Sequence, residues 1–304
     1  KQSLHYKEKK NKRKISPLLW CIFFILFTLR VSWGFNTFQK RQAWNNYLNR
    51  LKSQKGLIIL SAQKKEGIYQ VHGLRDPLAK NPGELLKKEA KKLGIRENWK
   101  NYYSLNPEFI LERAKKFLTP PSTITLTLSN DIISAEGEAS QRWIETFHQK
   151  ALTLPGINGF NIEKVQNTDQ KMMDKRIEDL TEIQIYFKNN STEFAEGQEN
   201  NLVQILDSIK NIQTLQSRLK TWVQIVIFGH TDSSGTENLN QRLSRSRAER
   251  IFNHLTINGI NPGFITISGV GTQLPLKEEL KTDDRKYNRA VSFKTFYIPS
   301  TDGG

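Results

Sequence analysis

Cysteine and histidine are scarce in this chain of 304 residues. Cys21 is the single cysteine, which excludes an intramolecular disulfide. The five histidines show no metal-ligand spacing such as HExxH, and the sequence contains no glycine-rich phosphate loop. We therefore predict a protein that is not an enzyme and that holds no metal and no cofactor.

One group of polar residues admits a catalytic interpretation. His230 and Asp232 lie close together, with several serines nearby. Alternate residues of a strand point to opposite faces, however, and the glycines that frame a nucleophilic serine are absent here. We expect His230 to pack or to form hydrogen bonds at the end of a strand.

Acidic residues are also in deficit, because 30 Asp and Glu stand against 46 Lys and Arg and leave a net charge of +16. Nucleic acid is the usual partner of so basic a chain. The excess is uneven, however, since residues 175–304 are nearly neutral whereas residues 1–14 hold seven basic residues and one acid. A basic cluster before an apolar run is typical of membrane topology. We predict no nucleic-acid partner.

Lysine doublets carry part of the remaining charge, at Lys87-Lys88, Lys91-Lys92 and Lys115-Lys116. Each doublet falls on a predicted helix. A solvated helix face is the simpler interpretation, and contact with anionic lipid head groups or wall polymers is the alternative.

The apolar run that follows the basic flank is short, because Ile15–Leu29 covers only fifteen residues without charge. A membrane-spanning helix needs about 20 residues, and continuation through Phe35 supplies them if Arg30 extends to the interface. A cleaved signal peptide has a similar pattern, but no small-x-small cleavage site follows. We therefore predict a signal anchor over residues 15–36. The flank 1–14 would be cytoplasmic, and everything after the anchor would lie across the cytoplasmic membrane.

The middle of the chain carries two similar patterns about one hundred residues apart. A helix with Trp44 and a helix with Trp143 are each followed by a glycine turn and a short strand, and both tryptophans are expected in the core. The segments between them alternate in polarity as strands do. This α/β alternation resembles BON domains, small modules of envelope proteins. We place the two segments at residues 37–104 and 105–168.

The C-terminal part alternates between strands and helices. The β-branched and aromatic run Thr221–Phe228 ends at Gly229, and apolar residues then recur at helical spacing. We predict strands at 183–187, 221–228, 264–268 and 290–296, helices at 199–218 and 238–255, and a helical turn near Asp284. Such alternation predicts one sheet with its helices on one face and a ligand site at the strand ends.

Two opposite charges flank the loop after the second of these strands. Asp232 follows the strand, and Arg247 lies fifteen positions later beside the buried stripe of the helix. An arginine near a core needs an acidic partner. From spacing alone, an internal salt bridge and a pair that grips a zwitterionic ligand are equally good interpretations.

The residues around this pair resemble a known family. The matching residues are Gly229-His230-Thr231-Asp232, Gly235, Asn240, Leu243-Ser244, Arg247-Ala248, Gly269, Gly271, Pro275 and Asn288-Arg289 followed by Val291. In this order they resemble the OmpA-like C-terminal domain, a peptidoglycan-binding module also found in Pal lipoproteins and MotB-type stator proteins. The resemblance covers about residues 183–296, and we place the domain at 169–304.

The resemblance implies that Asp232 and Arg247 hold the diaminopimelate of a peptidoglycan stem peptide. A guanidinium pairs with a carboxylate through two hydrogen bonds, while an aspartate suits an ammonium. The resemblance also implies ligand-binding positions for Thr231, Asn240 and Arg289.

Two residues depart from the family pattern. Ala290 stands where the family has a second arginine, and Lys188 stands where it usually has an aspartate. These departures put affinity or stem-peptide preference in doubt and leave the central pair intact.

Together these observations predict an α+β protein with an N-terminal transmembrane helix, a BON-like α/β middle region and an OmpA-like βαβαβ domain. We expect a non-catalytic tether between the cytoplasmic (inner) membrane and peptidoglycan in the periplasm, open to homodimer formation or contact with other envelope proteins. A MotB-type stator is one alternative, but its membrane helix needs an acid and residues 15–35 have none. The envelope-anchoring part of a larger signalling or enzymatic protein, extending before Lys1, is the other.

Overall fold

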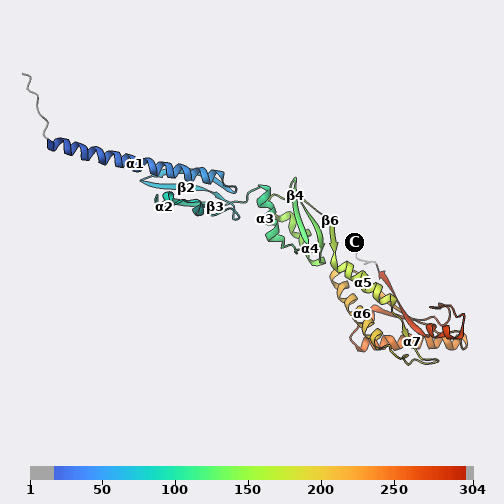
Figure 1. Ribbon diagram of the computed structural model, residues 1–304. Helices are drawn as coiled ribbons and strands as arrows, with labels where there is room; N and C mark the ends of the chain where they lie inside the picture. The colour runs from blue at the N-terminus through green and yellow to red at the C-terminus, as the bar shows by residue number, and fades with distance from the viewer. Residues whose placement is uncertain (1–16, 299–304) are drawn as a thin grey trace, which may run out of the picture. The chain divides into compact units, whose positions relative to one another are not determined.

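The structure is a computed structural model that describes residues 17–298 (Figure 1). The predicted basic flank, residues 1–14, lies outside the described residues. The chain divides after Arg113 into two compact units. Both units combine helices and strands, which confirms the α+β class.

The first unit begins with α1 (Pro17–Ser53), a continuous helix of 37 residues. Large apolar side chains on it are exposed up to Phe38, and by length and composition Trp20–Ser53 is a candidate membrane span. Further along the same helix, Trp44 is buried as predicted. The sequence predicts an anchor and then a separate helix, whereas the structure joins the two. The reason is that no glycine or proline follows Gly34 before the helix ends.

The sheet of the first unit packs against the end of α1. Its strands are β1 (Leu57–Lys65), β2 (Ile68–Arg75) and β3 (Arg96–Asn101), with η1 (Pro82–Leu85) and α2 (Lys88–Lys91) between the last two. The first two strands form an antiparallel hairpin, and β3 pairs with β2 in parallel. Tyr47, Leu51, Tyr69 and Val71 belong to its core.

A second three-stranded sheet with the same strand pairing follows, formed by β4 (Ile124–Ser129), β5 (Ile132–Ala139) and β6 (Gly159–Asn167). The helices of this segment are α3 (Pro107–Leu118), α4 (Gln141–Lys150) and η2 (Ala151–Thr153). Again the first two strands form an antiparallel hairpin and the third pairs in parallel. Corresponding strands of the two sheets begin 63 to 67 residues apart.

The prediction that the helices of Trp44 and Trp143, about one hundred residues apart, occupy equivalent positions in a repeat is therefore wrong. Trp44 lies on the helix before the first hairpin, whereas Trp143 lies on α4, inside the crossover to the third strand. The two helices look alike because each carries a tryptophan and ends in a glycine turn. Trp143 is buried, as predicted, and its Nε1 donates a hydrogen bond of 2.9 Å to the Leu118 carbonyl. The BON resemblance stays a prediction.

The C-terminal part of the second unit contains one four-stranded sheet. Its elements are α5 (Thr168–Glu182), β7 (Ile185–Tyr186), α6 (Glu199–Leu219), β8 (Trp222–Gly229), α7 (Glu237–Ile257), η3 (Pro262–Phe264), β9 (Ile265–Gly269), η4 (Thr282–Asp284), α8 (Arg285–Asn288) and β10 (Ala290–Ile298). The strand order is β7-β10-β8-β9, with β8 and β9 parallel and β10 antiparallel to both its neighbours. Each predicted element of this region is present with its bounds within two residues, and α5 is an addition.

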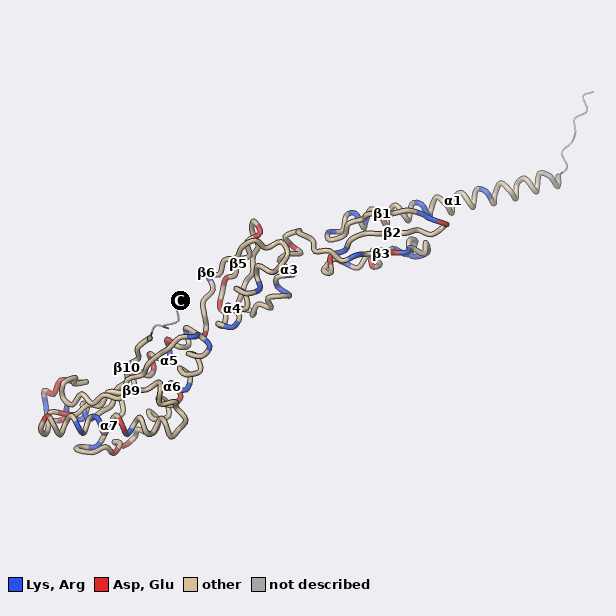
Figure 2. The backbone as a smooth tube through the Cα atoms, turned by 180° about the vertical axis from the view of Figure 1, so that it is seen from behind, with Lys and Arg blue, Asp and Glu red and all other residues tan. Residues whose placement is uncertain are grey.

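The helices of this domain cover one face of the sheet. Val223, Ile225 and Ile227 alternate along β8 and are buried in one core with apolar residues of α5, α6 and α7. On the other face Trp222 and Phe296 are exposed. Acidic and basic residues mix along these elements (Figure 2), in keeping with the near-neutral charge of this region.

Candidate functional site

Two glycines allow α7 to lie very close to the ends of β8 and β9. A Cβ atom on Gly229 would lie 1.8 Å from the Ser244 carbonyl oxygen, and one on Gly269 would lie 2.6 Å from the Arg245 nitrogen. Both neighbours are backbone atoms of the helix, which cannot move aside alone. The glycines of the family pattern therefore fix the distance between the strand ends and the helix that carries Arg247.

Asp232 is buried and has Arg289, not Arg247, as its ionic partner. Arg289 Nε donates to Oδ2 of Asp232 at 2.6 Å. The backbone nitrogen of Ser234 donates to Oδ1 at 3.1 Å, and the Ser234 hydroxyl contacts the same oxygen. Burial alone would raise the pKa of Asp232, but the hydrogen bonds from Ser234 and Arg289 outweigh it and hold that pKa below its ordinary value. The Asp232–Arg247 salt bridge that spacing allows is not what forms.

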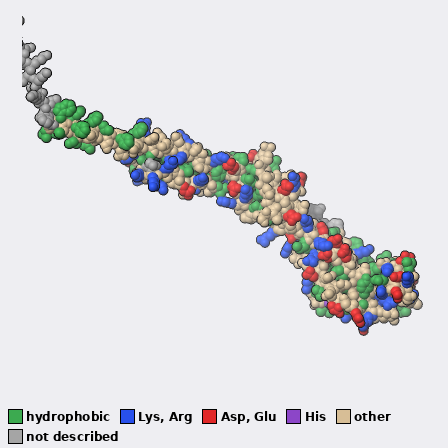
Figure 3. All heavy atoms as spheres, in the orientation of Figure 1, with side chains coloured by type: hydrophobic (Ala, Val, Ile, Leu, Met, Phe, Trp, Pro, Cys, Tyr) green, Lys and Arg blue, Asp and Glu red, His purple; other side chains and the backbone are tan. Residues whose placement is uncertain are grey.

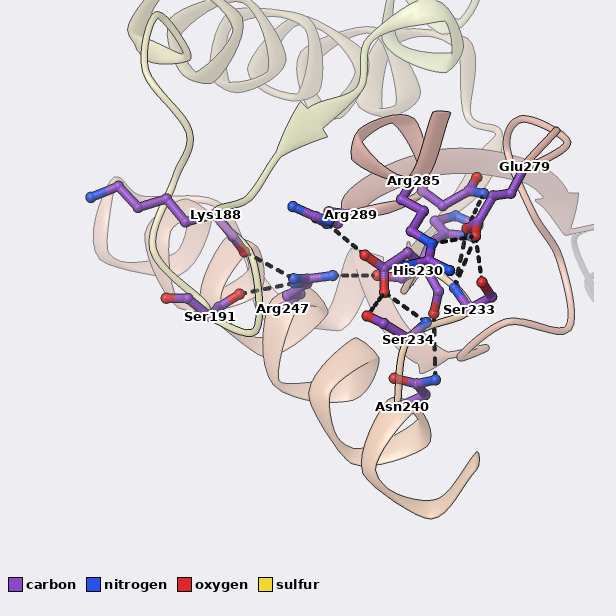
Figure 4. A network of polar contacts seen from close by, with 12 residues as sticks. Lys188, Ser191, His230, Ser233, Ser234, Asn240, Arg247, Glu279, Arg285 and Arg289 are labelled. Atoms are coloured by element: carbon purple, nitrogen blue, oxygen red, sulfur yellow. Dashed lines mark hydrogen bonds and ion pairs between the residues drawn. The ribbon is translucent and has the colours of Figure 1, made fainter. Parts of the chain in front are cut away.

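Arg247 is one of the most deeply buried side chains of the described chain, with 1% of its surface exposed. Its guanidinium donates from Nε to the Ser191 carbonyl at 3.0 Å, from Nη1 to the His230 carbonyl at 2.8 Å and from Nη2 to the Lys188 carbonyl at 3.2 Å (Figure 4). Burial lowers the pKa of Arg247 to about 10, so the group stays cationic at neutral pH. Each terminal nitrogen carries two N–H groups, and each uses one of them in these hydrogen bonds.

Asp232 and Arg247 line the same pocket, which has a volume of about 540 Å³. Thr231 also lines it, and its buried Oγ1 has no hydrogen-bond partner among the described residues. Asn240, buried in the wall, donates from Nδ2 to the Asp232 carbonyl at 3.4 Å and so holds the loop. The structure thus brings four of the predicted residues to one pocket and joins the fifth, Arg289, to it through Asp232.

The two residues that depart from the family pattern lie differently from the central pair. The Lys188 side chain points away from Arg247 (Figure 4), and its Nζ pairs with Glu193 at 2.8 Å. Ala290 is fully buried, and its carbonyl accepts a hydrogen bond from the backbone nitrogen of His230 at 2.8 Å. The Lys188 charge is therefore compensated outside the pocket, and position 290 is enclosed.

His230 is occupied by structural hydrogen bonds. Its Nδ1 lies 2.8 Å from the Leu274 carbonyl oxygen, and its Nε2 lies 2.8 Å from the Ser292 hydroxyl. A carbonyl only accepts, so Nδ1 carries the proton and Nε2 accepts from Ser292. Burial lowers the pKa of His230, which favours this neutral form. Neither ring nitrogen contacts Asp232, in agreement with a histidine that bonds at a strand end.

Several residues that position the site escape prediction from the sequence. Asn288 is buried, and both polar atoms of its side chain form hydrogen bonds. Its Oδ1 accepts from the backbone nitrogens of Leu276 and Lys277, and its Nδ2 donates to the Lys277 carbonyl and to Glu279. Glu279 in turn accepts from the backbone nitrogen and hydroxyl of Ser233. The family match at Asn288 is the one signal in the sequence for this network, which connects the loop before β10 to the loop after β8.

Comparison with known proteins finds relatives of the C-terminal domain. Residues 186–289 match the model of the OmpA family. The chain is 34% identical over 99 residues to outer membrane protein A of Buchnera aphidicola subsp. Schizaphis graminum, which covers 33% of this chain and only 27% of that protein. It is 26% identical over 199 residues to outer membrane protein A of Bordetella avium, covering 58% of this chain and 97% of that protein.

Among solved structures, the peptidoglycan-associated lipoprotein of Burkholderia pseudomallei is 21% identical with a TM-score of 0.33, covering 37% of this chain and 89% of that one. The chain carries an OmpA-like domain at its C-terminus, as its motifs indicate. It spans about a quarter of the length of the Buchnera protein.

Proposed function

We propose that this chain is a non-catalytic tether between the cytoplasmic membrane and peptidoglycan. The apolar part of α1 would cross the membrane, residues 37–104 and 105–168 would form a spacer, and the OmpA-like domain over 169–304 would bind the wall in the periplasm. The observation that carries the proposal is the placement of Asp232 and Arg247 in one pocket at the end of β8.

The geometry supports recognition of a diaminopimelate end, which bears a carboxylate and an ammonium on one carbon. Arg247 would offer one N–H from each terminal nitrogen to the carboxylate, in the bidentate manner that guanidinium favours. Asp232 would accept from the ammonium. The Thr231 hydroxyl would find in the ligand the partner that the protein does not give it.

Arg289 has a particular role in this scheme. It occupies Oδ2 of Asp232 at 2.6 Å and keeps the carboxylate ionised. A ligand ammonium would share Asp232 with Arg289 or displace it. The side chain of Arg289 is partly exposed, 22% against 6% for Asp232, so it has room to turn toward solvent.

Cosedimentation of the full chain with insoluble sacculi tests this proposal. We expect the wild-type protein to sediment with diaminopimelate-type sacculi and free diaminopimelate to release it. Asp232→Asn keeps the size of the side chain and removes the charge, so binding should fall. Arg245→Ala, an exposed arginine of the same helix, is the control and should bind normally. Equal sedimentation of wild type and Asp232→Asn would refute the proposed role of the carboxylate.

The membrane part of the proposal needs a separate measurement. Protease added to spheroplasts should degrade the OmpA-like domain if it lies outside the cytoplasmic membrane. A domain that survives in intact spheroplasts and is digested only after lysis would contradict the proposed topology.

A further inference from the structure

A basic pocket lies between α1 and α2 in the first unit. Its volume is about 770 Å³, and its lining includes four cationic side chains. Lys40 and Arg50 come from α1, while Lys87 and Lys92 stand at the two ends of α2. Figure 3 shows the basic side chains of this unit gathered over α2, next to the apolar run of α1.

Among the described residues that line this pocket, none is an aspartate or a glutamate. Arg50 Nε donates to the carbonyl of Asn46 at 3.2 Å, which is a neutral partner. Amide side chains supply the rest of the polar lining, at Asn36, Gln39, Gln42 and Asn46. Four like charges around one pocket give it a positive potential, which favours an anion there.

The position of the pocket along α1 indicates where that anion would come from. Exposed apolar side chains continue to Phe38, and the pocket lining on the same helix begins at Asn36. A helix rises 1.5 Å per residue, so Lys40 stands only about 8 Å beyond Phe35 along the axis. The polar head groups occupy a layer of about this thickness beside the hydrocarbon core.

We propose that this pocket binds the phosphate head group of an anionic phospholipid in the membrane that α1 crosses. The lysines supply point charges and the amides supply neutral donors to the phosphate oxygens. A zwitterionic lipid carries its own cation and gains less. This site goes beyond wall binding, and it rests on the proposed function only in requiring that α1 spans the membrane.

The test uses the full chain in a nonionic detergent, with native mass spectrometry to count bound lipid. Phosphatidylglycerol and phosphatidylcholine are added in separate titrations. The pocket variant is Lys87→Gln with Lys92→Gln, which leaves α1 unchanged. The matched control is Lys65→Gln with Lys100→Gln, two exposed lysines of the same unit that lie outside the pocket lining. Circular dichroism confirms that each variant is folded.

We expect wild type to retain phosphatidylglycerol in preference to phosphatidylcholine. Each basic residue near an anionic surface contributes about fivefold to affinity, so the pocket variant should lose roughly thirtyfold while the control keeps its affinity. Equal retention of both lipids by wild type, or an equal loss in both variants, would overturn the proposal. So would release of the lipid by an equimolar amount of soluble glycerol phosphate, because the ligand would then be a free phosphate. Sacculus binding of the pocket variant should stay normal, which separates failure here from failure of the tether.

Discussion

Replacement of Arg247 by alanine should unfold the site before it reveals anything about ligand binding. The guanidinium ties together three backbone carbonyls, those of Lys188 and Ser191 in the loop after β7 and that of His230 at the end of β8. These segments are distant in sequence. Alanine would leave the three carbonyls without this donor and open a cavity.

The size of the effect follows from these contacts. A hydrogen bond to a charged group contributes about 1.5–3 kcal/mol, but the three bonds are not additive, and removal of a buried cation recovers its desolvation cost. We expect a net loss of about 3–5 kcal/mol, because each buried carbonyl left without a donor costs about 1–3 kcal/mol. Domains are stable by only about 5–15 kcal/mol, so Arg247→Ala would keep little of its stability.

Hydrogen–deuterium exchange of the full chain measures this loss within the domain. Peptides of α7 and β10 should exchange faster in Arg247→Ala by the factor that corresponds to this free energy, while peptides of β4 and β5 should keep their rates. Arg247→Lys keeps the charge but not the planar set of five N–H donors, so its exchange rates should lie between those of wild type and Arg247→Ala. If the alanine variant lost less than about 1 kcal/mol, the net value of a single ordinary hydrogen bond, the structural role argued for Arg247 would be wrong.

Three further predictions concern the same site. Gly229→Ala should destabilise the domain by about 3 kcal/mol, the upper end for overpacking, because its Cβ would lie 1.8 Å from a carbonyl oxygen of α7. Urea unfolding measures this loss, and Gly263→Ala is the control. The folded-state pKa of Asp232 is lowered, so the folded form binds its proton less readily than the unfolded form; stability should fall as pH drops below about 4, and by less in Asp232→Asn. His230 should be neutral and protonated on Nδ1 in nitrogen NMR spectra at pH 7, and because burial depresses its pKa, its contribution to stability should decline below about pH 6.5; a cationic ring at pH 7 would contradict this.

The sequence predicts the OmpA-like domain well because its local signals agree with one another. The apolar alternation of β8, the glycine at its end and the helical stripe of α7 each occur within a few residues and point to one packing arrangement. Motif spacing then brings Asp232 and Arg247 to the same pocket. The partner of Asp232 could not be obtained in this way, because Arg289 is 57 residues away in sequence and reaches it only through the pairing of β10 with β8.

The middle region is harder to predict for a related physical reason. Its core residues identify helices and strands, but the register of the repeat depends on which helix precedes a hairpin and which crosses over. Trp44 and Trp143 carry no information on that choice. Asp76 shows the same difficulty, because it is fully buried and accepts hydrogen bonds from Arg113 Nη2 at 2.8 Å and from Ser104 N at 2.7 Å, and both donors are distant in sequence. Long-range partners of this kind leave no local pattern.

The central claim is that Asp232 and Arg247 form a site for diaminopimelate. Its most direct test is the affinity of free diaminopimelate for the full chain, measured by isothermal titration calorimetry with wild type, Asp232→Asn and the control Arg245→Ala. We predict saturable binding to wild type and to the control, and a loss of roughly tenfold or more in Asp232→Asn, as expected when one buried charge-assisted hydrogen bond is removed. Binding that is absent in wild type, or unchanged in Asp232→Asn, would contradict the account.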